Sequence, residues 1–183
     1  LFWGAIRAGV IPVLLNTRLT TDQYRYLLDD SRAKAVFVSA ALLPVVREAA
    51  RDVPTLRSVV VVGGGPESVS RRDRLLAAEN EGGAPARTNA DEVAYWLYSS
   101  GTTGAPKGVM HVHSSPMETA RLAGQCRSGI REDDVVFSAA KLFFAYGLGN
   151  ALTFPLSAGA TTILMAERPT PQAVFRRLVE HKP

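Results

Sequence analysis

The sequence has little of what marks secreted, membrane-spanning or nucleic-acid-binding proteins. Its single cysteine, Cys126, excludes an internal disulfide and fits a reducing, cytoplasmic location. No apolar run reaches the ~18 residues of a membrane-spanning helix, and no signal-peptide pattern opens the chain. The 21 basic and 17 acidic residues are spread without a long run. A net charge of +4 therefore gives no support for a nucleic-acid or membrane partner.

What the chain does have is a regular alternation of strand and helix patterns. Its 183 residues, 46% of them apolar, suffice for one domain with a sizeable core. Short apolar runs predict strands at 10–15, 34–39, 57–62, 93–98, 108–112, 135–139 and 161–165. Helical patterns occupy 41–51, 70–80, 117–127 and 170–182, and a capping box at Thr20 and Gln23 begins another helix. This alternation predicts an α/β fold of mostly parallel sheets flanked by helices.

The segment from Tyr98 to Gly108, with the sequence YSSGTTGAPKG, combines features that suit a polyphosphate. Its glycines free the backbone to approach a ligand, and its hydroxyls and Lys107 supply donors and one positive charge. A flexible surface turn is the alternative without function. A Walker P-loop is excluded, because Pro106 precedes Lys107 and Gly108 follows it where glycine and a hydroxyl residue are required.

The ten residues from Ser99 to Gly108 resemble the phosphate-loop signature of the AMP-forming acyl-adenylate synthetases. Two further segments, 7–16 (RAGVIPVLLN) and 154–164 (FPLSAGATTIL), resemble the upstream and downstream stretches of that superfamily. The resemblance implies an enzyme that joins a carboxylic acid to AMP using ATP and then transfers the acyl group to coenzyme A. It implies that Lys107 is catalytic. It also implies that ATP is bound by Ser99, Ser100, Gly101, Thr102, Thr103, Gly104 and Lys107.

Within the superfamily, residues 141–150 (KLFFAYGLGN) look most like the benzoate–CoA ligase group. The resemblance implies that Ala145 and Tyr146 line an aromatic-acid pocket. Phe143, Phe144 and Tyr146 could form a flat apolar slot, or Phe143 and Phe144 could simply belong to the core. Lys141 is expected to reach the surface rather than a substrate carboxylate.

Several parts of the family's machinery are absent from the sequence. No Tyr-Gly-x-Thr-Glu motif is present to hold Mg²⁺, nor a Thr-Gly-Asp motif to bind ribose, and no protein metal ligand is assigned. The chain is therefore expected to be part of the large N-terminal adenylation domain, residues 1–183, without the C-terminal lid domain and inactive alone. The resemblance leaves a homodimer open. His111 and His113 are expected to have a structural or pocket-edge role, and Cys126 to lie in the core.

Two other functions stay open at this stage. One is a different acyl-adenylating enzyme, such as a fatty-acyl–CoA ligase or a domain that loads a carrier protein. The other is a nucleotide-binding module without catalysis. If the protein is an aryl-acid–CoA ligase, its expected substrates are a small aromatic acid, ATP with Mg²⁺, and coenzyme A.

Overall fold

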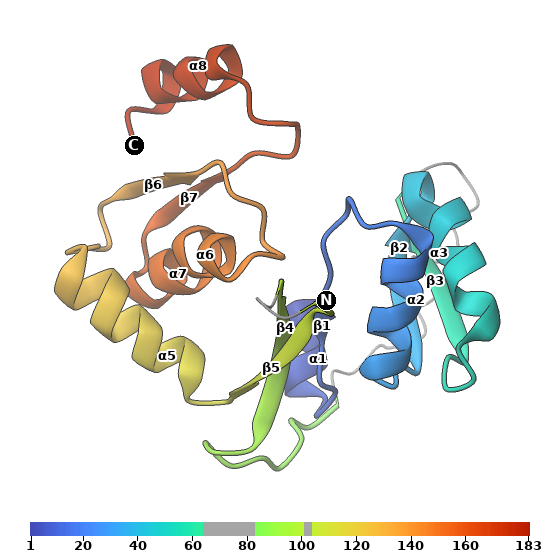
Figure 1. The fold of residues 1–183 in the computed structure, drawn as a ribbon. Coiled ribbons are helices and arrows are strands. Elements are labelled where there is room, and N and C mark those ends of the chain that lie inside the picture. The colour runs from blue at the N-terminus through green and yellow to red at the C-terminus, as the bar shows by residue number, and fades with distance from the viewer. Residues whose placement is uncertain (64–82, 101–103) are drawn as a thin grey trace. The chain divides into compact units, whose positions relative to one another are not determined.

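The computed structural model describes residues 1–63, 83–100 and 104–183 (Figure 1). The chain divides into two compact units. One consists of residues 1–15, 86–100 and 107–183, and the other of residues 16–85 and 101–106. The helix predicted at 70–80 lies outside the described residues.

The first unit contains a three-stranded sheet with β4 at its centre. β1 (Val13–Leu14) pairs parallel to β4 (Val93–Ser99), and β5 (Lys107–Val112) pairs antiparallel to β4. β4 is central because its run of apolar residues can be covered on both faces. Ala94, Tyr95 and Leu97 are buried there with Leu148. Phe2 and Ile6 of α1 (Phe2–Arg7) pack against this cluster.

A second, two-stranded parallel sheet follows in the same unit. β6 (Val135–Ser138) pairs with β7 (Thr161–Leu164), in register from Val135 opposite Thr161 to Ser138 opposite Leu164. α6 (Ala145–Leu148), a π-helical turn (Gly149–Thr153) and α7 (Phe154–Ala158) connect the two strands. α8 (Pro171–His181) follows β7. Its predicted start is confirmed: the Thr170 side chain accepts a hydrogen bond from the backbone of Ala173.

The helix predicted at 117–127 is present, but the position expected for Cys126 is wrong. α5 (Ser115–Thr119) continues into a π-helical segment, Ala120–Arg127. The buried positions are Pro116, Ala120 and Gly124, spaced four apart, and a Cβ on Gly124 would lie 2.8 Å from Cβ of Phe154. Cys126 is exposed because this narrow stripe, rather than the wider apolar pattern, faces α7.

The second unit pairs β2 (Ala35–Ser39) parallel to β3 (Ser58–Val62). α2 (Thr21–Asp30) opens with the predicted capping box, in which the Thr20 side chain accepts from Gln23 and the Gln23 side chain accepts from Thr20. α3 (Leu43–Ala49) is flanked by 3₁₀ turns at Ala40–Leu42 and Ala50–Asp52. The helices bury Tyr24, Leu27, Leu28, Val46 and Ala49.

Three of the four strand pairings are parallel, so the predicted α/β class with mostly parallel sheets is confirmed. The helix predicted at 170–182 carries an apolar stripe that is not buried. Phe175 and Val179 of α8 are 65% and 75% exposed. Among the described residues, no helix has the length and apolar character needed to cross a membrane.

Candidate functional site

The predicted phosphate loop begins and ends on two paired antiparallel strands. β4 ends at Ser99 and β5 begins at Lys107, and these two residues are partners in the antiparallel register. A hydroxyl and an ammonium group therefore stand on paired positions where the turn begins and ends. The segment that follows the loop is a strand, whereas a Walker P-loop leads into a helix, so the exclusion of that motif is confirmed.

Gly108 lets the aromatic side chains of β4 lie against the start of β5. A Cβ at this position would meet the Trp96 ring at 2.8 Å and the Tyr98 ring at 3.4 Å. Any larger residue would push the Trp96 ring away from the strand, whereas the Tyr98 ring stands at ordinary contact distance. The glycine directly after Lys107 is thus explained by close packing, which fixes the end of the loop where the lysine stands.

Ser99, Ser100 and Lys107 are exposed, as side chains that bind a polyphosphate must be. Gly104 is also exposed and has φ +121°, a backbone conformation that residues with a side chain rarely adopt. This angle supports a requirement for glycine at position 104, because of the backbone conformation there. Gly101, Thr102 and Thr103 lie outside the described residues.

Tyr26 contacts the loop, and this neighbour was missed by sequence reasoning. Its hydroxyl donates a hydrogen bond of 3.0 Å to the carbonyl oxygen of Pro106, the residue before Lys107. The two residues are 80 positions apart, and no local pattern connects them. This contact holds the backbone next to the candidate catalytic lysine.

The predicted aromatic-acid residues, Ala145 and Tyr146, begin the single-turn helix α6. They belong to the segment that follows the carboxyl end of β6 in a parallel sheet, where α/β folds commonly place their ligands. Tyr146 is 71% exposed and Phe144 is 49% exposed. The Phe143 and Phe144 rings lie 4.5 Å apart at 56°. Within the described chain, packing therefore leaves Phe144 and Tyr146 available to a ligand.

The core connects α6 to the strand that carries the phosphate loop. Leu148, two residues after Tyr146, is 4% exposed and belongs to the same buried cluster as Leu97. Leu97 in turn stands two residues before Ser99 on β4. Within the first unit, Ser99 and Tyr146 thus each stand two residues from a member of one buried cluster.

The expectation that Lys141 reaches the surface is wrong. Its Nζ donates hydrogen bonds to three successive carbonyl oxygens, those of Met165 at 2.6 Å, Ala166 at 2.8 Å and Glu167 at 2.7 Å. Since an ammonium group has three protons, all its donors are used. The expectation fails because the carbonyl oxygens of the residues that follow β7 lie within hydrogen-bond distance of the ammonium group.

His111 takes part in an aromatic contact. His111 stacks on Tyr95 with ring centroids 4.7 Å apart and planes 4° apart, and burial lowers the pKa of His111. In residues 1–63, 83–100 and 104–183, no three His, Cys, Asp or Glu side chains gather as metal ligands. This geometry supports the structural role expected of His111.

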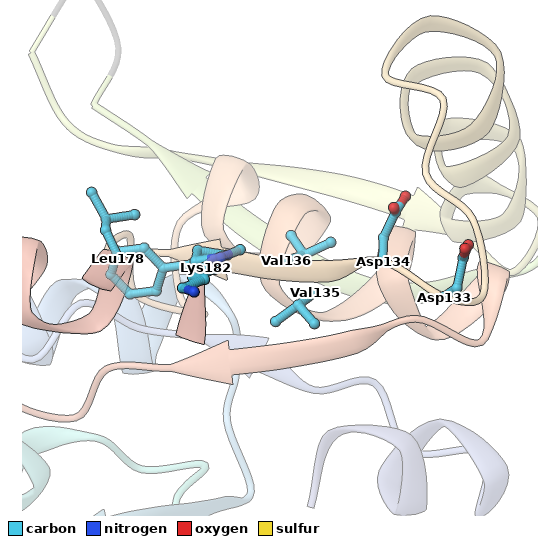
Figure 2. Close-up of a pocket in the computed structure, with 8 residues that line it drawn as sticks. Asp133, Asp134, Val135, Val136, Leu178 and Lys182 are labelled. Atoms are coloured by element: carbon cyan, nitrogen blue, oxygen red, sulfur yellow. The ribbon is translucent and has the colours of Figure 1, made fainter. Parts of the chain in front are cut away.

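A shallow groove runs along β6 beside the end of α8 (Figure 2). Asp133 and Asp134 lie at one end of it, and Leu178 and Lys182 lie at the other. None of the residues that line the groove belongs to the predicted site.

Comparison with known proteins places this geometry in context. A family model described as AMP-binding enzyme matches residues 1–183. The chain is 64% identical, over its whole length, to a 4-hydroxybenzoate–CoA/benzoate–CoA ligase of Rhodopseudomonas palustris, of which it covers 34%.

Two solved structures are also similar over the whole chain. One is a benzoate CoA ligase from Burkholderia xenovorans LB400, with 48% identity, TM-score 0.86 and 35% of that chain covered. The other is the anthranilate CoA ligase AuaEII in complex with anthranoyl-AMP, with 34% identity, TM-score 0.90 and 36% covered. The chain thus spans about a third of the length of each of these relatives.

Proposed function

Because this chain belongs to the AMP-binding enzyme family, we propose that it forms part of the N-terminal domain of an aryl-acid–CoA ligase. The full-length protein converts benzoate or a small substituted benzoate to its acyl-adenylate and then to its coenzyme A thioester. The pairing of Ser99 with Lys107 across the turn carries this proposal, because it holds a hydroxyl and a positive charge at one loop. The names of the similar proteins support an aromatic acid as substrate.

In the first step, a carboxylate oxygen attacks the α-phosphorus of ATP. The bond between that phosphorus and the bridging oxygen breaks, and pyrophosphate leaves with the electron pair. Lys107 donates hydrogen bonds to the departing phosphates and offsets their charge. Ser99, Ser100 and the open backbone at Gly104 donate to the same phosphates, with Gly101, Thr102 and Thr103 completing the loop.

In the second step, the sulfur of coenzyme A attacks the acyl carbon and AMP leaves, while the thiol proton passes to solvent. The aromatic ring rests against Tyr146, and the small side chain of Ala145 leaves space for the ring edge.

Mg²⁺ accompanies ATP in this chemistry, where it neutralises phosphate charge. Among the described residues, no three His, Cys, Asp or Glu side chains gather as ligands for the ion. The cytoplasmic location and the homodimer stay predictions.

Acid-dependent exchange of labelled pyrophosphate into ATP tests the proposal on the full-length protein. We expect exchange with benzoate and with 4-hydroxybenzoate, at a higher kcat/KM than with octanoate. A preference for octanoate would leave an acyl-adenylating enzyme but refute the aromatic substrate. Absence of exchange with all three acids, together with binding of ATP, would favour a nucleotide-binding module without catalysis.

A further inference from the structure

Lys141 sits between two segments that leave the same edge of the second sheet. Since β6 and β7 are parallel and in register, the residues after Ser138 and those after Leu164 emerge side by side. The first of these segments leads to Ala145 and Tyr146, and the second contains the three carbonyls bound by Lys141. One ammonium group therefore joins the segment that carries the acid pocket to the end of the neighbouring strand.

The carbonyl-bearing segment is itself held in place. Arg177 of α8 donates to the Glu167 carboxylate at 2.5 Å and to the carbonyl oxygen of Ala173 at 3.0 Å. The Arg177 side chain is 15% exposed and the Glu167 side chain is 44% exposed, so this ion pair is shielded from solvent on the arginine side only. Met165, the first of the three residues whose carbonyl oxygens accept from Lys141, is buried at 5% exposure. Lys141 is thus attached to a fixed support.

On the other side, the backbone of Lys141 contacts the start of α6. The amide of Phe144 donates to the Lys141 carbonyl oxygen at 3.1 Å, and the amide of Leu148 donates to the carbonyl of Phe144 at 2.8 Å. Gly147 lies so close that a Cβ there would overlap the Lys141 carbonyl oxygen. A shift of Lys141 must therefore move the turn that presents Ala145 and Tyr146.

We propose that Lys141 is a positioning residue for the acid pocket: by binding three carbonyls after β7, it sets where Ala145 and Tyr146 stand and hence which acids fit. This inference rests on the proposed function. Lys141 does not touch the substrate in this arrangement, because its three donors are already used. A lysine is suited to the position because its compact ammonium can serve three converging acceptors, whereas the planar guanidinium of arginine cannot match all of them.

The test compares Lys141→Met, Lys141→Arg and Lys34→Met in the full-length enzyme. Methionine keeps the length and apolar stem of the lysine but donates no hydrogen bond. Lys34 is an exposed lysine and serves as the matched control. KM and kcat for benzoate, 4-hydroxybenzoate and octanoate, and KM for ATP, are measured by pyrophosphate exchange. Thermal unfolding of each variant and hydrogen exchange at the amides of Phe144 and Leu148 are measured alongside.

We expect Lys141→Met to raise KM for benzoate about tenfold, to narrow the preference for benzoate over octanoate, and to change KM for ATP less than twofold. Hydrogen exchange at Phe144 and Leu148 should accelerate. Lys141→Arg should recover part of the loss, and Lys34→Met should behave as wild type. An equal rise in KM for acid and ATP would show a merely structural role. Unchanged acid kinetics in Lys141→Met would refute the proposal. Full recovery of the acid kinetics in Lys141→Arg would also refute it, because the guanidinium group cannot match all three carbonyls.

Failure of the proposed function has a different signature, because it would be visible in the wild type as exchange without benzoate dependence. In that case the same comparison is made with whichever acid the wild type does activate. If Lys141→Met fails to fold, Lys141→Arg carries the test, since it keeps the charge and part of the hydrogen bonding. An arginine variant with wild-type ranking of the three acids would then contradict the inference.

Discussion

Replacing Gly147 with alanine adds one methyl group where the backbone leaves no room for it. The new Cβ would overlap the carbonyl oxygen of Lys141 and lie 2.7 Å from its carbonyl carbon. Carbon atoms in contact are normally about 3.5–4.0 Å apart. The shortfall is therefore roughly 1 Å, and it is measured against backbone atoms, which cannot swing aside like the end of a flexible side chain.

Relief of this overlap must move α6 or the turn at 140–141. Overpacking of this kind typically costs about 1–3 kcal/mol, and a rigid backbone neighbour favours the upper end of that range. Because Ala145 and Tyr146 share the turn with Gly147, the acid pocket shifts with it. A misplacement of about 1 Å can reduce a rate by roughly 100-fold. We expect kcat/KM for benzoate to fall by about that factor, with KM for ATP little changed.

The assay is benzoate-dependent pyrophosphate exchange by the full-length protein, with thermal unfolding measured in parallel. Gly4→Ala is the matched control: it makes the same chemical change in helix α1, where the new Cβ would have no described atom within 4 Å apart from its chain neighbours and its own helix backbone. That variant should gain about 0.5–1 kcal/mol of stability, since alanine favours a helix over glycine. A Gly147→Ala enzyme with wild-type stability and acid kinetics would refute the packing argument.

Four further predictions concern the loop, the pocket and the stacked histidine. Lys107→Ala removes a charge-assisted bond of about 1.5–3 kcal/mol, so adenylation should slow by roughly 10- to 100-fold; an unchanged rate would exclude its role. Gly104→Val should slow adenylation further, because valine strongly disfavours φ +121°, and wild-type kinetics would contradict the requirement for glycine. Ala145→Leu should raise KM for benzoate through overpacking of about 1–3 kcal/mol, and an unaltered ranking of acids would refute the pocket. Burial lowers the pKa of His111 in the folded state, so its contribution to stability is complete above its unfolded pKa and declines as pH falls below that value. Urea unfolding between pH 7.5 and 5 should show a smaller loss for His111→Gln than for wild type, and identical pH profiles would exclude this role.

The sequence by itself determined the local elements and the chemistry of the loop. The capping box at Thr20, the central strand at 93–98 and the Thr170 cap depend on neighbouring residues, so their patterns are legible in one dimension. The same holds for the loop at 99–108, because hydroxyls, glycines and a lysine in a short stretch suit a phosphate in any fold that exposes them. The choice of Ala145 and Tyr146 came from a resemblance, and their function stays a prediction.

Only the tertiary structure decided how distant segments meet. The hydrogen bond from Tyr26 to Pro106 and the three bonds from Lys141 join residues 24 or more positions apart, and no periodicity encodes such pairs. The exposure of Cys126 likewise depended on which helix face met α7. An ammonium group binds whichever acceptors the fold brings within reach, and a helix buries whichever stripe has a partner. Neither the acceptors of the ammonium group nor the partner of the helix stripe can be read from the local sequence. Both belong to segments that are distant in the sequence and become adjacent only after folding.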